Sequence, residues 1–340
     1  MKILITGANG FIGSFVVEEA LNRGYEVWAA MRQTSSKANL KTVENNPNLH
    51  FIDLPYSSQE SLCQLFTKQK ETVGKWDHIV HTMGLTKCKK KEDFDIVNFQ
   101  YTQNIVNALI QSDMVPQHFI YMSSLSAFGD GDKVTLKEIK LNDTPTPNTY
   151  YGKSKLKSEK FLQSLDIQQF PYTILRPTGV YGPKEKDYFV MLQTLSNHLN
   201  PGIGFKPQYI TFIYVKDLVK TIFLAIEKRA IGKAYFVADG DVWTSDDYAN
   251  LCKKLLGVKA VTVKFPEWIA KVVCYTFDTV GGWFGVTPTL NIDKYNILAA
   301  KNWKCELEPL QQDLGFTADY KLERGLKESI EWYKQNGWLK

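Results

Sequence analysis

A cluster of two tyrosines and three lysines, NTYYGKSKLK at residues 148–157, holds side chains that can carry acid–base chemistry. Residues four apart lie on one face of a helix, so Tyr151 shares a face with Lys155 but not with Lys153. Tyr150 has no lysine at that spacing. The pKa of a free tyrosine is near ~10, and an ammonium one turn away favours the phenolate and lowers that pKa. The spacing predicts Tyr151 and Lys155 as a proton-transfer pair, with a solvated lysine-rich helix as the alternative.

Ser124 is the third candidate for chemistry. The apolar run Phe119–Met122 leads directly into a stretch of small hydroxyl residues that includes Ser124. Ligands of parallel sheets bind at the carboxyl ends of the strands, so a serine at this point lies where a substrate would be. We therefore expect Ser124 to hydrogen-bond and orient the substrate oxygen that exchanges a proton with Tyr151.

A glycine-rich stretch, TGANGFIG at residues 6–13, joins a strand-like run to a helix-like segment. The first glycine permits a tight turn, the second lets the backbone approach a pyrophosphate, and the third allows close helix–strand packing. The helix N-terminus then offers N–H groups and a positive dipole to phosphates. A turn without a ligand is the alternative, but the strand–turn–helix context favours a dinucleotide site. The predicted contacts are Gly7, Asn9, Gly10, Phe11, Ile12 and Gly13.

The end of the second strand-like run bears on which dinucleotide is bound. NAD-specific sites place an acid there for the ribose 2′-hydroxyl, whereas this chain has Met31 followed by Arg32. An arginine can pair with a 2′-phosphate and stack on adenine, and Lys37 lies close enough in sequence to assist. These residues favour NADP(H), with NAD(H) as the alternative cofactor and a solvated arginine as the alternative role of Arg32.

The elements that must position these groups follow from hydrophobic periodicity. Apolar runs alternate with helix-period segments, which predicts βαβ units and an α/β, doubly wound parallel sheet of the Rossmann type. The predicted strands are Ile3–Thr6, Glu26–Ala30, Leu49–Ile52, His78–His81, Phe119–Met122 and Tyr172–Leu175. The predicted helices are Phe11–Arg23, Ser58–Gln69, Phe94–Gln111 and Tyr151–Leu165.

The pattern loosens after Arg176, where glycine and proline become frequent. A strand followed by a helix is expected over Thr211–Glu227, a further strand over Ala234–Ala238, and a mainly helical tail from Thr244 onward. We expect a Rossmann domain of residues 1–176 plus about 211–240. A smaller, mainly helical substrate-binding lobe would comprise residues 177–210 and 241–340.

Composition excludes several classes of protein. The net charge of +5 is mild and forms no basic face interleaved with aromatic residues, so no nucleic-acid partner is expected. The five cysteines never fall in a CxxC spacing, which predicts reduced thiols in a cytoplasmic protein and no metal site. No secretory signal is expected. The apolar window at residues 265–290 is too interrupted to span a membrane, which leaves lipid-surface contact or a substrate pocket.

Together, the glycine turn and the Ser…YxxxK set resemble the extended short-chain dehydrogenase/reductase superfamily, the NAD(P)-dependent epimerases and dehydratases. The segments LRPTGVYGP at residues 175–183 and FIYVKD at residues 212–217 also resemble this family's motifs. The resemblance implies that Ser124, Tyr151 and Lys155 form a catalytic triad and that Lys155 also holds the nicotinamide ribose. It further implies a homodimer through the helices Asn98–Gln111 and Tyr151–Leu165.

The resemblance also implies roles for residues outside the triad. Asp53 resembles the family's adenine contact, Leu54 packs beside it, and Asn98 matches a helix asparagine that supports the active site. The family's HxAA stretch reads HTMG at residues 81–84, so the loop on the nicotinamide side is expected to differ. The lone histidine there is expected to be packed or to face substrate, not to bind metal. The remaining predicted cofactor contacts are His81 and Pro177.

Two departures bear on the substrate. Nucleotide-sugar enzymes of this family carry an asparagine and an arginine where this chain has Gly179 and Ile210. The sequence looks closer to the dihydroflavonol-reductase and 3β-hydroxysteroid-dehydrogenase branch, and its second half is rich in bulky apolar residues. We therefore expect NADPH-dependent reduction of a carbonyl on a hydrophobic substrate: sterol-like, flavonoid-like or long-chain keto-lipid. The alternatives are an NDP-sugar epimerase, dehydratase or reductase, and a non-catalytic NADP(H) sensor or scaffold.

Overall fold

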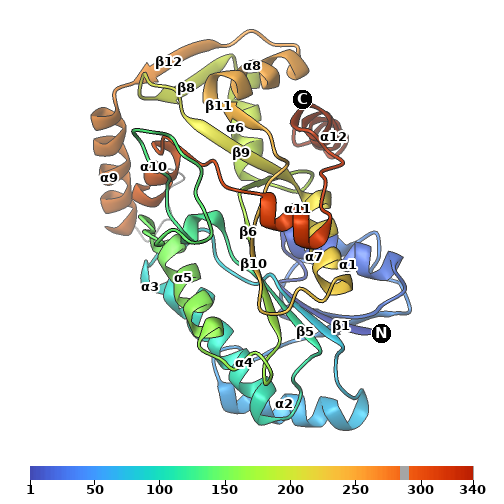
Figure 1. Cartoon of the computed structure of the whole chain (residues 1–340). Coiled ribbons are helices and arrows are strands. Elements are labelled where there is room, and N and C mark those ends of the chain that lie inside the picture. Colours follow the sequence, from blue (N-terminus) through green and yellow to red (C-terminus); the bar gives the residue numbers. More distant parts are fainter. Residues whose placement is uncertain (284–290, 340) are drawn as a thin grey trace.

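A seven-stranded parallel sheet forms the centre of the fold (Figure 1). The computed structural model describes residues 1–283 and 291–339, so residues 284–290 of the apolar window lie outside the described part. The strand order is β10-β6-β5-β4-β1-β2-β3. The strands are β1 Lys2–Thr6, β2 Glu26–Ala30, β3 Leu49–Ile52, β4 His78–His81, β5 His118–Met122, β6 Tyr172–Pro177 and β10 Ala234–Val237.

The sheet reverses its winding at β1. Ile3 of this strand pairs with Val27 of β2 on one side and with His78 of β4 on the other. In such sheets ligands bind outside the carboxyl ends of the strands at the point of reversal, here beyond β1 and β4. The predicted doubly wound parallel sheet is confirmed, and the predicted strand Ala234–Ala238 joins it as its seventh member, β10.

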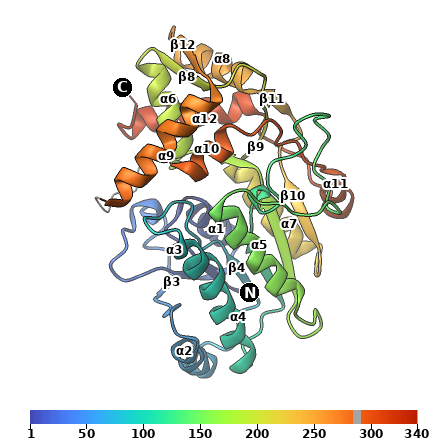
Figure 2. The same cartoon turned by 90° about the vertical axis from the view of Figure 1, so that its left-hand side faces the viewer.

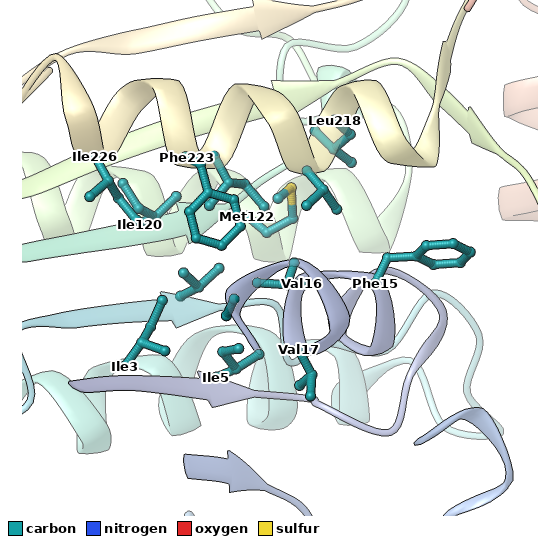
Figure 3. Close-up of a cluster of buried hydrophobic side chains, with 14 of the residues drawn as sticks. Ile3, Ile5, Phe15, Val16, Val17, Ile120, Met122, Leu218, Phe223 and Ile226 are labelled. Carbon is teal, nitrogen blue, oxygen red and sulfur yellow. The ribbon is translucent and has the colours of Figure 1, made fainter. Parts of the chain in front are cut away.

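Helices cover both faces of the sheet (Figure 1). Figure 3 shows Val16 of α1 and Phe223 of α7 directed toward Ile120 and Met122 of β5, and all four side chains are buried. Burying side chains of this size stabilises a fold by about 1.5–3 kcal/mol each. One face is covered by α1 Phe11–Asn22 and α7 Val215–Glu227, and the other by α2 Gln59–Thr72, α4 Tyr101–Gln111 and α5 Tyr150–Gln163.

Much of the second half of the chain forms a smaller lobe above the sheet in Figure 1. Two small sheets contribute to it: β7 Gly179–Tyr181, β9 Tyr209–Tyr214 and β11 Val242–Thr244 form one, and β8 Leu199–Ile203 and β12 Val261–Phe265 the other. The helices around them are α6 Asp187–Ser196, α8 Ser245–Leu256, α9 Glu267–Trp283, α10 Ile292–Leu298 and α12 Leu322–Gln335. Its core is aromatic and includes Tyr181, Phe212, Tyr248 and Tyr333.

One segment of the tail lies in the sheet domain instead of the lobe. Helix α11, Glu308–Leu314, packs against α7 and β10, and its Leu310 and Leu314 are buried in the same core as α1 and α7. The expected lobe of residues 241–340 is therefore interrupted, because the chain returns to cover the exposed end of the sheet before it forms α12.

The predicted helix Phe94–Gln111 is not continuous. A short helix α3, Glu92–Phe94, leads into a π-helical turn, Asp95–Gln100, and only then into α4. A π-turn inserts an extra residue and rotates the side chains that follow, and such turns occur frequently at functional sites. Asn98 lies within it and is buried. In the part of the chain that the structure describes, no helix combines the length and apolarity needed to cross a membrane.

Candidate active site

The glycine turn is built from close backbone approaches. Gly7 has φ +66°, and a Cβ there would lie 2.9 Å from the backbone of Met83. A Cβ on Gly13 would lie 2.2 Å from the carbonyl oxygen of Gly7, so this helix–strand contact requires glycine. Gly10 is the N-cap of α1, and no side chain hydrogen-bonds there. The first-turn N–H groups therefore face outward without a capping side chain, as a phosphate site requires.

The loop after β2 lies against this turn. The side-chain amide of Asn9 donates to the Ser36 backbone carbonyl at 3.5 Å, and the backbone carbonyl of Asn9 accepts from the side-chain amide of Asn39 at 3.0 Å. Arg32 is exposed in the same loop, and the Lys37 ammonium lies 4.0 Å from the centre of the Phe51 ring. The structure thus brings the predicted 2′-phosphate groups to the same edge as the predicted pyrophosphate site.

The predicted adenine contacts lie at the end of β3, beside this loop. The Asp53 carboxylate accepts from the Gln33 backbone N–H at 3.1 Å. Leu54 is only 3% exposed and packs into the core beneath the sheet. Asp53 therefore holds the loop that carries Arg32, and Leu54 supports this edge mainly from within the core.

The N-terminus of α5 carries the tyrosines. Thr149 caps the helix by accepting from the Gly152 N–H at 2.9 Å. Asp293, from α10 of the lobe, accepts from the backbone N–H groups of Tyr150 at 2.9 Å and Tyr151 at 3.3 Å. A carboxylate at this end of a helix is also favoured by the helix dipole. The lobe therefore fixes the start of α5 directly.

Ser124 and Tyr151 lie close together. Ser124 follows β5 and opens a 3-10 turn, Leu125–Ala127, and its hydroxyl is near enough to Tyr151 to favour the ionised form of that tyrosine. A Cβ on Gly152 would lie 2.1 Å from the Ser126 carbonyl, so the first turn of α5 rests directly on this serine turn. Sequence reasoning did not single out Gly152, although its place directly after the tyrosine is a readable signal. Tyr150, by contrast, is 42% exposed.

The electrostatics of the pair differ from the sequence-based expectation. Burial raises the pKa of Tyr151 to about 12, and the nearby Ser124 hydroxyl only partly opposes that rise. Desolvation is the largest cause, so this pKa moves in the direction opposite to the one expected from the lysine spacing. Burial also lowers the pKa of Lys155 to about 8, against an opposing effect of Glu159. The Lys155 ammonium donates to the Met122 carbonyl at 2.8 Å.

Asn98 connects the neighbouring loop to α5. Its amide donates to the Leu85 carbonyl and to the Ser154 hydroxyl, both at 3.0 Å, and its oxygen accepts from the Leu85 N–H at 2.7 Å. A Cβ on Gly84 would lie 3.1 Å from both the Asn98 oxygen and the Lys155 nitrogen. A side chain at residue 84 would therefore press on Asn98 and Lys155, and Asn98 lies between the loop after β4 and α5.

His81 is a packed histidine. Its ring nitrogens lie 2.9 Å from the Thr6 hydroxyl and 3.0 Å from the Thr102 hydroxyl, and its side chain is fully buried. Burial lowers its pKa to about 3, so the ring is neutral at physiological pH. Its side chain therefore joins β1, at the start of the glycine turn, to α4. Pro177 is likewise buried, at the end of β6. No cluster of metal-ligating side chains occurs within the residues described.

A buried ion pair beneath α5 was missed by sequence reasoning. Arg176 of β6 donates to Glu159 of α5 at 2.8, 3.0 and 3.1 Å, and both side chains are less than 5% exposed. The Ser123 hydroxyl donates to the same carboxylate. The Arg176 guanidinium also lies 4.6 Å from the centre of the Phe128 ring. Glu159 lies four residues after Lys155, a spacing that placed it on the same helix face.

The substrate side differs from a nucleotide-sugar pattern for a steric reason. A Cβ on Gly179 would lie 2.1 Å from the Tyr188 hydroxyl of α6, so the ring occupies the space that a side chain at this position would need. Ile210 packs with the aromatic core of the lobe. Aromatic side chains therefore surround both Gly179 and Ile210.

Comparison with known proteins places this geometry in context. Residues 3–238 match the family described as the NAD dependent epimerase/dehydratase family. A 3-beta-hydroxysteroid dehydrogenase of Mycolicibacterium neoaurum is 24% identical over 98% of this chain and 91% of its own. A UDP-glucose 4-epimerase of Vibrio cholerae is 26% identical over 89% of this chain and 90% of its own. The solved dTDP-glucose 4,6-dehydratase of Bacillus anthracis in complex with NAD has a TM-score of 0.77 at 18% identity, covering 100% of this chain and 98% of that one.

The buried ion pair generates a stability prediction. Arg176→Met leaves the Glu159 carboxylate buried without its partner, which is expected to lower the free energy of unfolding by about 3–5 kcal/mol. Replacing both partners together, Glu159→Leu with Arg176→Met, is expected to lower it by less, because no unpaired charge remains. Urea unfolding followed by circular dichroism measures both.

The matched control is the exposed pair of Lys254 and Glu323, whose side chains are 71% and 56% exposed. Lys254→Met should change the unfolding free energy by about 0–1 kcal/mol. For the buried pair, the free energies lost by Glu159→Leu alone and by Arg176→Met alone are added and compared with the loss in the double variant. A double variant that loses as much as this sum would contradict this account of the pair.

Proposed function

The chain belongs to the NAD-dependent epimerase/dehydratase family, and on that basis we propose that it reduces a carbonyl on a hydrophobic substrate, or oxidises the alcohol, with NADP(H). The observation that carries this proposal is the contact between Ser124 and Tyr151 at the carboxyl end of β5, with Lys155 on the same helix. These are the groups that hydride transfer to a carbonyl needs beside a dinucleotide site.

Proton transfer is assigned to Tyr151. When bound, the nicotinamide ring supplies a hydride to the carbonyl carbon, and the Tyr151 hydroxyl gives its proton to the carbonyl oxygen, which yields the alcohol. The raised pKa of about 12 keeps this hydroxyl protonated at neutral pH, the form that reduction requires. Ser124 would hydrogen-bond the same oxygen as charge develops on it.

Lys155 is assigned to cofactor orientation. Its pKa of about 8 leaves most of the side chain protonated at neutral pH, and its nitrogen is held by the Met122 carbonyl. An ammonium in this position can donate to ribose hydroxyls with its remaining hydrogens. It also favours the Tyr151 phenolate that forms after proton transfer.

The preference for NADP(H) rests on Arg32. Arg32 is exposed beside the glycine turn, and the preceding residue is Met31 in place of an acid. A guanidinium can form charge-assisted hydrogen bonds with a 2′-phosphate, whereas a carboxylate there would repel it. The solved relative with bound NAD makes NAD(H) the alternative.

A hydrophobic substrate is supported by Gly179 and Ile210, where the Tyr188 ring and the aromatic core fill the space. The 3-beta-hydroxysteroid dehydrogenase relative supports the same assignment. An NDP-sugar epimerase or dehydratase is the second candidate, because the UDP-glucose 4-epimerase relative is similarly related.

Two substrate panels test the proposal. With NADPH, the purified protein should consume cofactor in the presence of steroid, flavonoid or long-chain ketones, followed by the loss of nicotinamide absorbance. UDP-glucose and dTDP-glucose incubated with NAD⁺ should yield no epimer or dehydrated product by chromatography. Turnover confined to the nucleotide sugars would establish the second candidate instead.

The two adjacent tyrosines give a matched pair of variants. Tyr151→Phe should lower kcat by about 100- to 10,000-fold, because the proton donor is lost, while the Kd for NADPH stays within about twofold. Tyr150→Phe, one residue earlier on the exposed side, should leave kcat nearly unchanged. An inactive Tyr150→Phe protein with an active Tyr151→Phe protein would refute the assignment.

Arg32→Ala tests the cofactor assignment. It should weaken NADPH binding by roughly 10- to 100-fold, the size of a lost charge-assisted hydrogen bond, and leave NADH binding within about twofold. Arg324→Ala, an exposed arginine of α12, serves as the control and should change neither. Titration of cofactor fluorescence measures all four affinities, and an equal loss for NADH and NADPH would rule out a 2′-phosphate role.

A further inference from the structure

An apolar surface lies on the outer side of the lobe. More than half of the exposed large hydrophobic side chains in the described residues fall within residues 199–205 and 261–277. Elsewhere such residues are scattered singly along the chain, as on most proteins. We use the name apolar surface for Val261, Val263, Phe265, Trp268, Val272 and Tyr275, which are 36–68% exposed.

The first part of the apolar surface is one side of the β8–β12 sheet. Val261, Val263 and Phe265 alternate along β12, so they lie on one side, and they pair in register with Leu199, Pro201 and Ile203 of β8. The opposite side is polar: Asn200 donates to Thr262 at 3.1 Å, and Lys264 pairs with Asp246. This small sheet therefore turns its apolar side outward.

The second part is a stripe along α9. Trp268, Val272 and Tyr275 recur at the spacing of one helix face, opposite the buried Ala270 and Cys274. Ala270 and Cys274 pack with Ile203, which belongs to the apolar side of β8. Helix α9 thus packs against that side of the sheet. Figure 1 and Figure 2 both show α9 at the outer edge of the lobe.

Positive charge surrounds this surface. Lys259 and Lys271 are exposed within two residues of it in the chain, and Lys206 is exposed after β8, the strand that pairs with β12. Within the described residues none of the three forms an ion pair, whereas two neighbouring acids are paired, Asp246 with Lys264 and Glu267 with Lys301. An apolar surface with a free lysine rim complements an anionic, amphipathic partner.

We propose that the apolar surface docks on the headgroup region of an anionic lipid bilayer. Tryptophan, tyrosine and phenylalanine on a helix with adjacent lysines are the residues that bind membrane interfaces, where apolar rings insert and ammonium groups meet lipid phosphates. A second copy of the chain fits less well. A two-fold contact through this surface would bring two rims of the same positive charge into one interface.

Docking here places the candidate active site close to the bilayer. Tyr295 of α10 packs on Ala270 and Cys274 of α9, and Asp293 of the same helix caps Tyr150 and Tyr151. The lipid-facing helix is thus two contacts away from the tyrosine. The docking itself does not depend on the proposed reaction, so its test uses no substrate.

The test is co-sedimentation of the full chain with vesicles. Phosphatidylcholine vesicles that contain phosphatidylserine should bind the protein, added salt should weaken that binding, and pure phosphatidylcholine should bind much less. Trp268→Ser with Val272→Ser should lower partitioning at least tenfold. Phe51→Ser with Ile110→Ser, at exposed positions on β3 and α4 of the sheet domain, should leave it unchanged.

A second set of variants tests the lysine rim. Lys206→Glu, Lys259→Glu and Lys271→Glu together should lower binding to anionic vesicles by roughly 100-fold, at ~1 kcal/mol for each lysine near the surface. Lys68→Glu, Lys160→Glu and Lys327→Glu change the net charge equally and should have a much smaller effect.

Equal losses in the two triple variants, or no binding of the unaltered chain to anionic vesicles, would overturn the proposal. Analytical ultracentrifugation supplies the remaining outcome. If Trp268→Ser with Val272→Ser converted a dimer to a monomer while vesicles bound neither form, the apolar surface would be a subunit interface.

Discussion

The candidate active site depends on the ion pair between Glu159 and Arg176. It joins the middle of α5 to β6 through three hydrogen bonds in a region from which water is excluded. Isolated charges are not tolerated in such a region, so each side chain confines the other to one position. Ser123, directly before Ser124, donates to the same carboxylate. A single buried contact therefore sets where the helix with Tyr151 lies relative to the strand with Ser124.

Close backbone approaches complete the positioning. The turn that faces the pyrophosphate site, the loop after β4 and the first turn of α5 each contain a glycine whose Cβ would meet a neighbouring backbone atom or a site side chain: Gly7, Gly13, Gly84 and Gly152. Two of these contacts hold the cofactor edge, and two hold the catalytic edge. At Gly7, Gly13 and Gly152 the neighbouring atoms belong to the backbone, so the backbone itself fixes these parts of the site, which is the preorganisation that catalysis requires.

Local signals predicted most of this arrangement. The strands followed from apolar runs, and the choice of Tyr151 and Lys155 followed from helical spacing, which tertiary packing does not alter. The π-turn at Asp95–Gln100, the Asp293 cap and the Glu159–Arg176 pair depend on residues far apart in the chain, so no local pattern contains them. The direction of the Tyr151 pKa failed for a related reason. Spacing reveals the ammonium, whereas the desolvation that raises the pKa of Tyr151 depends on the whole surrounding fold.

The packed helices α9 and α10 make contacts on two sides. Their inner residues Ala270, Cys274 and Tyr295 form a small core, and from that core Asp293 reaches the start of α5. Their outer residues add no stability to the isolated fold, because side chains as exposed as Trp268 and Val272 remain in contact with water. Burial of those side chains in another apolar phase would therefore stabilise the packed helices α9 and α10 as a unit. Since Asp293 belongs to that unit, such docking would also favour the capped form of α5, in which Tyr151 meets Ser124.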